Sequence, residues 1–250
     1  MTDRPRASHS PAPFLSSEQG SRGDGSTTPE RVLVTAGPTW EAIDAVRYLG
    51  NRSSGRMGTE IARAAAALGH PVTLLRGPGT VDPGRDSRIE TIRFQSAGEL
   101  AAELEERWPS HDLLFMAAAV ADFRPRNSAT PETKLRRTGT SITLELDPVP
   151  DLLAGLAKIP HQGTRIGFAL EPPAELIDQA RAKLARKGLH AIVANPLETM
   201  ESQEIDGTLL LADGTSRRPD LGRLPKDDFA HWLVESALAV HRDRDDFPGP

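Results

Sequence analysis

A polar stretch between residues 37 and 58 holds the side chains best suited to binding a charged ligand. Asp44, Arg47, Asn51 and Ser54 fall within it, and it ends in the run Gly55-Arg56-Met57-Gly58. A helix that begins after such a run offers free N–H groups and the positive end of its dipole to an anion. The stretch therefore predicts a site for a nucleotide or a similar anion.

Two elements are needed to position this stretch. The apolar run 32–34 predicts a buried strand before it, and residues 59–68 predict a helix after it. A second polar turn at 121–125 follows another apolar run, 112–120. Ligands of open α/β sheets bind beyond the carboxyl ends of the strands, so we expect both turns to line one crevice.

Strand and helix patterns alternate along the rest of the chain. Further strands are predicted at 72–75, 88–94, 112–120, 141–146, 165–171 and 191–195, and helices at 97–108, 151–158, 174–187 and 226–242. A hairpin is predicted from residue 207 around an Asp213-Gly214 turn. This order predicts an α/β fold with a Rossmann-like parallel sheet flanked by helices and a small hairpin.

Composition narrows the classes of function. The 250 residues carry a net charge of −5, which disfavours broad binding to nucleic acid or to a membrane surface. The absence of cysteine excludes disulfides, thiolate nucleophiles and cysteine-ligated metals, and the histidines do not pair at metal-ligand spacing. No apolar run is long enough for a membrane helix, and no secretory signal is present, so a cytoplasmic protein is predicted.

The chain is predicted to be one domain with two loose ends. Residues 1–29 are rich in Ser, Pro, Gly and Arg and bury too little apolar surface to offset ordering, which predicts a disordered tail. Residues 30–244 then form the nucleotide-binding domain, and 245–250 a flexible end.

The nucleotide motif is not the dinucleotide fingerprint. No G-x-G-x-x-G follows the first strand, and no G-x-x-x-x-G-K-[ST] occurs. The single tyrosine, Tyr48, has Arg52 four residues later, so a Tyr-x-x-x-Lys pair is missing. An NAD(P)-dependent reductase is therefore the less favoured alternative.

Several blocks of sequence together resemble one enzyme family. They are Gly37-Pro38-Thr39, Val46-Arg47-Tyr48, Asn51-x-Ser53-Ser54-Gly55, Ala118-Ala119-Val120-Ala121-Asp122-Phe123-Arg124-Pro125, Lys134-Leu135-Arg136-Arg137 and Ile166-Gly167-Phe168-Ala169-Leu170-Glu171. In this order, across most of residues 31–242, they resemble phosphopantothenoylcysteine synthetase of the stand-alone bacterial type. The resemblance implies a ligase of coenzyme A biosynthesis that joins phosphopantothenate to L-cysteine. It also implies CTP and Mg²⁺, an acyl-cytidylate intermediate, and release of CMP and pyrophosphate.

The resemblance also implies roles for particular residues. Asn51 and Arg47 match residues that handle the acyl-cytidylate, and Lys134 matches the first lysine of a flexible basic strap, here residues 127–140, that closes over the nucleotide. The implied nucleotide-binding residues are Gly37, Ser54, Gly55, Ala118, Ala119, Asp122 and Phe168. The strap region provides dimer contacts in the family, so a homodimer is implied.

Simpler interpretations and departures from the family pattern leave alternatives open. Arg47 could only pair with Asp44, Asn51 could only cap a turn, and Asp122 could only bond its own loop. The chain reads Pro148-Val149-Pro150-Asp151 where the family has Lys-Asn-x-Asp, and Pro196 where it has aspartate. An ATP-using or non-catalytic nucleotide-binding homologue therefore stays as the alternative.

Overall fold

The computed structural model describes residues 28–126, 134–136, 139, 141–200 and 202–246. Its main sheet contains β1 (Val32–Ala36), β4 (Val72–Arg76), β5 (Ile89–Arg93), β6 (Leu113–Met116), β9 (Thr164–Glu171), β10 (Ala191–Pro196), β12 (Thr208–Leu211) and β13 (Ser216–Arg217). These eight strands lie in the order β13-β12-β10-β9-β6-β1-β4-β5. The strands from β10 to β5 run parallel, whereas β12 and β13 pair antiparallel.

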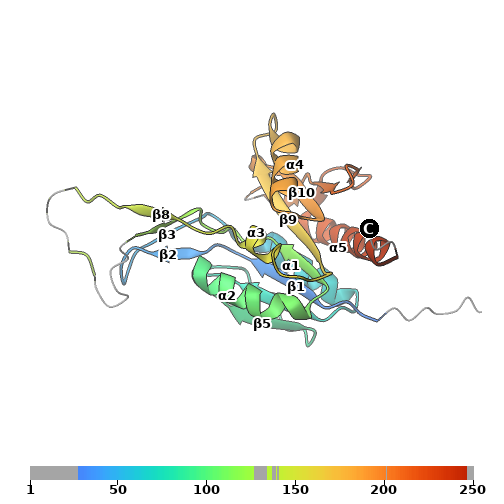
Figure 1. The fold of residues 1–250 in the computed structure, drawn as a ribbon, viewed down its shortest axis with the longest axis horizontal. Coiled ribbons are helices and arrows are strands. Elements are labelled where there is room, and N and C mark those ends of the chain that lie inside the picture. The colour runs from blue at the N-terminus through green and yellow to red at the C-terminus, as the bar shows by residue number, and fades with distance from the viewer. Residues whose placement is uncertain (1–27, 127–133, 137–138, 140, 201, 247–250) are drawn as a thin grey trace, which may run out of the picture.

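Helices cover both faces of this sheet (Figure 1). They are α1 (Arg56–Ala67), α2 (Ala97–Arg107), α3 (Leu152–Leu156), α4 (Leu176–Arg186) and α5 (Lys226–Asp246), with two 3₁₀ turns, η1 (Trp108–Ser110) and η2 (Leu197–Thr199). Successive side chains of a strand point to opposite faces. Accordingly, Val32 and Val34 join the apolar cluster of α1 and α5, whereas Leu33 joins the cluster of α2, α3 and α4.

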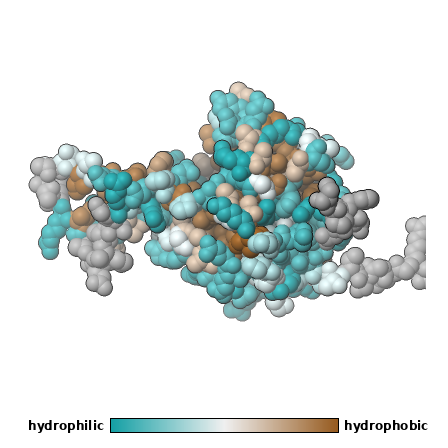
Figure 2. All heavy atoms as spheres, in the orientation of Figure 1, coloured by the Kyte–Doolittle hydropathy of each residue, from teal (hydrophilic) through white to brown (hydrophobic). Residues whose placement is uncertain are grey.

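Two short antiparallel pairs form an arm that projects from the body (Figure 1). β2 (Trp40–Ala42) pairs with β3 (Tyr48–Gly50), and β7 (Phe123–Pro125) pairs with β8 (Leu146–Pro148). A third pair, β11 (Glu204–Ile205) with β14 (Leu224–Pro225), lies beside α5. Figure 2 shows hydrophobic residues spread along the arm among polar ones.

The predicted α/β sheet flanked by helices is confirmed, with the hairpin strands β12 and β13 as an antiparallel extension. The predicted strand at 112–120 was too long, because β6 ends at Met116. Its neighbour β1 ends at Ala36, and Gly37 then turns with a φ of 87°. The chain after β6 bonds to this turn instead, since the Ala119 N–H donates to the Gly37 carbonyl at 2.9 Å.

The predicted strand at 141–146 was largely wrong. Only Leu146 of this range belongs to a strand, β8, because no described strand lies beside residues 141–145. The predicted long polar loop after Gly37 also contains β2 and β3, which the polar composition concealed.

The predicted ends of the chain are only partly within the described residues. Most of the 1–29 tail lies outside them, as do residues 247–250, while α5 continues to Asp246. No helix in the described part of the chain has both the length and the apolar character needed to cross a membrane.

Candidate functional site

A pocket of about 600 Å³ lies at the carboxyl ends of β6, β9 and β10. This is the edge of the sheet at which the sequence predicts ligand binding. Its walls come from the loop after β3, the segment after β6, the start of α3, the end of β9, one face of α4 and the turn after β10. The predicted residues that line it are Asn51, Ala118, Ala119, Asp122 and Phe168.

The first wall joins the two polar turns predicted from the sequence. The Asn51 side-chain amide donates to the carbonyls of Ala119 at 3.3 Å and Val120 at 3.1 Å. The hydroxyl of Thr35 accepts from the Ala118 N–H at 3.0 Å and fixes the same segment against β1. Asn51 thus bonds to a segment far away in sequence, which is more than a local turn cap would do.

The second wall carries positive charge from α4. Lys183 donates to the Phe168 carbonyl at 2.8 Å, and burial lowers the pKa of its ammonium. Lys187 pairs with Asp151 at 3.0 Å, and Asp151 also caps α3 by accepting from the Ala154 N–H. Burial alone would raise the pKa of Asp151, but these hydrogen bonds leave it below its ordinary value.

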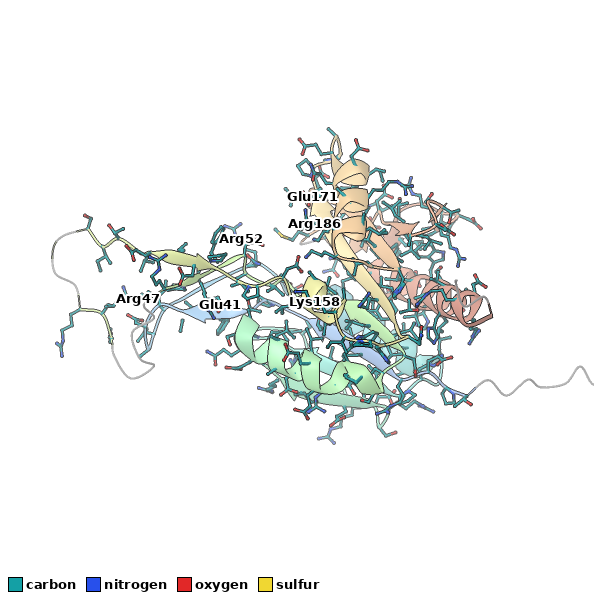
Figure 3. The ribbon with its side chains drawn as sticks, viewed as in Figure 1. Glu41, Arg47, Arg52, Lys158, Glu171 and Arg186 are labelled. Atoms are coloured by element: carbon teal, nitrogen blue, oxygen red, sulfur yellow. The ribbon has the colours of Figure 1, made fainter. Side chains whose placement is uncertain are left out.

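Arg47 lies outside this pocket, on the arm (Figure 3). Its guanidinium pairs with the buried Asp44, as the simpler sequence interpretation anticipated, and holds the pKa of that carboxyl well below its usual range. The backbone of Leu135, in the basic strap, bonds to both partners at 3.1 Å. Lys134 is exposed and does not line the pocket. Most other residues of the strap, including Arg137, lie outside the described residues.

Gly37, Ser54 and Gly55 also lie outside the lining of the pocket. Gly37 and Gly55 have φ values of 87° and 66°, and a side chain on either would meet Thr80. Glycine is therefore needed there for backbone shape and close packing. Gly55 is the N-cap of α1, and the Ser54 carbonyl accepts from the Val81 N–H. Their predicted contact with phosphate stays a prediction.

The sequence interpretation missed several pocket residues. Lys183 and Lys187 lie four residues apart on a predicted helix, a spacing that places them on one face and could have identified them. Arg52 and Glu171 both line the pocket, one after β3 and the other at the end of β9 (Figure 3). Lys226, the first residue of α5, had no local sequence signal.

A mostly parallel sheet with a polar pocket at its carboxyl edge defines a Rossmann-like α/β protein with a ligand-binding crevice. Residues 27–240 match the family of the DNA/pantothenate metabolism flavoprotein C-terminal domain, and the chain belongs to this family. The family resemblance carried by the sequence motifs is thereby confirmed.

Individual relatives agree with this assignment. The chain is 42% identical to the coenzyme A biosynthesis bifunctional protein CoaBC of Mycobacterium tuberculosis over 199 residues. This match covers 74% of this chain and 47% of that protein. The chain thus spans about half the length of the curated relatives it matches. The crystal structure of a CoaBC C-terminal domain is 29% identical, with a TM-score of 0.70 over 87% of this chain and 96% of that one. A Cab2 mutant in complex with phosphopantothenate-cysteine shares the fold, with a TM-score of 0.71 and 19% identity over 86% of this chain and 87% of that one.

Proposed function

We propose that this chain joins phosphopantothenate to L-cysteine in coenzyme A biosynthesis. Membership of the family and the likeness to CoaBC support the pathway. The observation that carries the proposal is the contact between two family motifs: Asn51 of the first is hydrogen-bonded to Ala119 and Val120 of the second, at the rim of one pocket.

The proposed chemistry has two steps. A carboxylate is a poor electrophile, so its oxygen first attacks the α-phosphorus of CTP, which forms an acyl-cytidylate and releases pyrophosphate. The amine of cysteine then attacks the acyl carbon, the bond from that carbon to the phosphate oxygen breaks, and CMP leaves. The amine loses a proton as the amide forms. Such a site must stabilise developing negative charge and exclude water.

The pocket offers groups suited to these tasks. We assign Lys183 and Lys187 to the nucleotide phosphates, because both are cationic and line the same wall. Phe168, Ala118 and Ala119 supply apolar surface for the base and ribose, with Asp122 as a hydrogen-bond acceptor. Asn51 is assigned to the acyl group because it lines the pocket beside this segment.

Arg47 and Lys134 both lie outside the pocket, so they cannot act on the same intermediate from within this pocket of a single chain. We propose that the protein is a homodimer assembled through the arm. The support is the apolar surface that a single chain leaves exposed there, at Val46, Tyr48, Phe123, Ile142, Leu144 and Leu146. A second chain on this surface would place other groups beside Arg47 and Lys134.

Magnesium is proposed to arrive with the nucleotide. Among the described residues, no three His, Asp or Glu side chains are grouped to hold a metal ion. Mg²⁺ binds mainly through substrate phosphates and water, with one or two carboxylates, and the pocket contains Asp122 and Glu171. Bound there, it would neutralise phosphate charge.

We also keep the cytoplasmic location as a prediction of the sequence.

A turnover assay tests the proposal. Purified protein receives phosphopantothenate, L-cysteine and Mg²⁺ with either CTP or ATP, and amide product and pyrophosphate are measured. We expect product with CTP, and pyrophosphate without amide when cysteine is left out. Product with ATP but not with CTP would make ATP the activating nucleotide, in line with the departures from the family pattern at Pro148 and Pro196. No product with either nucleotide would overturn the proposed function in favour of a non-catalytic homologue.

A further inference from the structure

Lys226 places a buried ammonium on the wall of the pocket, and the reaction outlined above gives it no role. The residue is only 7% exposed and lines the pocket from the first position of α5. Its Nζ donates to the carbonyls of Thr199 at 3.2 Å and Met200 at 3.4 Å. Both acceptors are neutral, and an ammonium has three N–H donors. A buried charge is unfavourable unless an opposite charge compensates it.

A second cation lies beside Lys226. Arg56 is the first residue of α1, which packs against α5 on the same face of the sheet (Figure 1). Its guanidinium donates to the side-chain oxygen of Gln203, whose backbone carbonyl accepts from the Lys226 N–H at 3.0 Å. Burial lowers the pKa of Lys226, and the positive charge of Arg56 lowers it further. The two cations therefore repel each other, with Lys226 in the lining of the pocket and Arg56 next to that lining.

No carboxylate within the described ranges forms an ion pair with either cation. The opposite wall differs in this respect. Lys187 has Asp151 at 3.0 Å, and the charge of Glu171 acts favourably on Lys183. Positive charge on the α4 wall is thus compensated within the protein, whereas positive charge on the α5 wall has no carboxylate partner among the residues that the structure describes.

We propose that Lys226, with Arg56 beside it, binds a phosphate group of a substrate in this pocket. A phosphate anion supplies the missing negative charge, and it accepts one hydrogen bond from the ammonium and two from a guanidinium. The two candidate sources are the triphosphate of the nucleotide and the phosphate monoester of phosphopantothenate. Naming these two sources rests on the proposed function. The phosphate subsite itself rests on two neighbouring cations that pair with no carboxylate in the described part of the chain.

Calorimetric binding of three separate probes tests this subsite. The probes are CTP, phosphopantothenate and inorganic pyrophosphate, and the last does not depend on the proposed substrates. Lys226→Gln removes the charge but keeps an N–H donor for the carbonyls of the turn, and Lys226→Arg keeps the charge. Lys158→Gln is the matched control, because Lys158 is exposed and outside the pocket (Figure 3).

We expect Lys226→Gln to weaken binding of at least one probe tenfold or more, with Lys226→Arg closer to wild type and Lys158→Gln unchanged. A loss confined to CTP or to phosphopantothenate identifies that molecule as the source of the phosphate. If wild-type protein binds pyrophosphate but neither substrate, the proposed function fails, and the subsite stands when Lys226→Gln weakens pyrophosphate.

Three results would overturn the subsite. The first is wild-type protein that binds none of the probes, and the second is folded Lys226→Gln that binds all of them within twofold of wild type. The third concerns the case in which Lys226→Gln does not fold. Arg56→Gln, a change of a half-buried side chain, then replaces it, and we expect this variant to weaken binding of at least one probe fivefold or more. Unchanged binding in Arg56→Gln would overturn the subsite in that case.

Discussion

The body and the arm of this molecule bury their apolar residues to very different extents. In the body, Phe115 and Phe229 are completely buried between the sheet and its helices. On the arm, Val46 is 62% exposed and Ile142 is 53% exposed. The body therefore gains its stability from contacts within one chain, whereas the arm has apolar surface that remains available for a partner.

Asn51 lies where the arm joins the body, directly after β3, and changing it is expected to have the largest effect. In Asn51→Asp, carboxylate oxygens face the carbonyls of Ala119 and Val120, which the amide now bridges as a donor. Oxygen atoms that both only accept hydrogen bonds repel each other. We expect turnover to fall at least 100-fold, about 2.7 kcal/mol of transition-state stabilisation. Amide product formed per second measures it.

A matched control adds the same charge elsewhere. Gln162→Glu changes an exposed amide to a carboxylate outside the pocket and should leave turnover within twofold of wild type. The melting temperature of Asn51→Asp should stay near that of wild type, because Asn51 is exposed. Wild-type turnover in Asn51→Asp would contradict a role for this residue in the mechanism. It would also show that the junction of arm and body takes no part in the reaction.

Charges placed on the arm test whether its apolar surface is an interface. The double variant Ile142→Asp, Leu144→Asp should raise the dissociation constant of the dimer at least tenfold, because carboxylates would have to be buried in the contact. Sedimentation over a range of protein concentrations measures this. The melting temperature of the body should change little, since neither side chain belongs to a core cluster.

Leu221→Asp is the control for the arm variant. Leu221 is 83% exposed and belongs to the body, so its substitution should leave association unchanged. A wild-type chain that sediments as a monomer at all concentrations would contradict the dimer, as would equal effects of the two changes.

In the body we expect an effect on stability alone, a pH dependence centred on His190. Burial lowers the pKa of its imidazole from 6.5 to about 3, and its Nδ1 accepts from the Arg165 N–H at 2.9 Å. Between pH 6.5 and pH 3 the unfolded chain binds a proton that the folded chain does not. Stability should therefore fall as pH decreases through this range, by up to about 1.4 kcal/mol per pH unit.

Urea unfolding at pH 7.0, 6.0 and 5.0 measures this slope. His190→Asn keeps an acceptor near the Nδ1 position and should reduce the slope, because asparagine does not titrate. Some slope should remain, since burial also lowers the pKa of His111. An unchanged slope in His190→Asn would show that another group accounts for the pH dependence.

The body was predictable from the sequence because its elements are long enough to show a local pattern. Strand β9 and helix α2 match their predicted ranges closely, and Ser96 caps α2 by accepting from the Glu99 N–H at 3.2 Å. The arm was not predictable, because its strands have only three residues each and depend on contacts across the chain. Stacking of Trp40 on Tyr48, with ring centroids 3.8 Å apart, is one such contact.

The site divides in the same way. Asn51 and the segment from Ala118 to Asp122 were found because each belongs to a compact motif beside a strand end. Lys226 was not found, since its place in the pocket depends on how α5 meets the turn at Thr199 and Met200. No local sequence pattern predicts this contact, because the two segments approach each other only in the folded chain.

The two outer strands of the main sheet have a consequence for how this protein behaves at high concentration. β13 has only two residues, and β5 exposes Glu90, Thr91 and Arg93. Very short or charged edge strands are poor templates for pairing with another chain. The sheet is therefore protected against growing from molecule to molecule into a fibre.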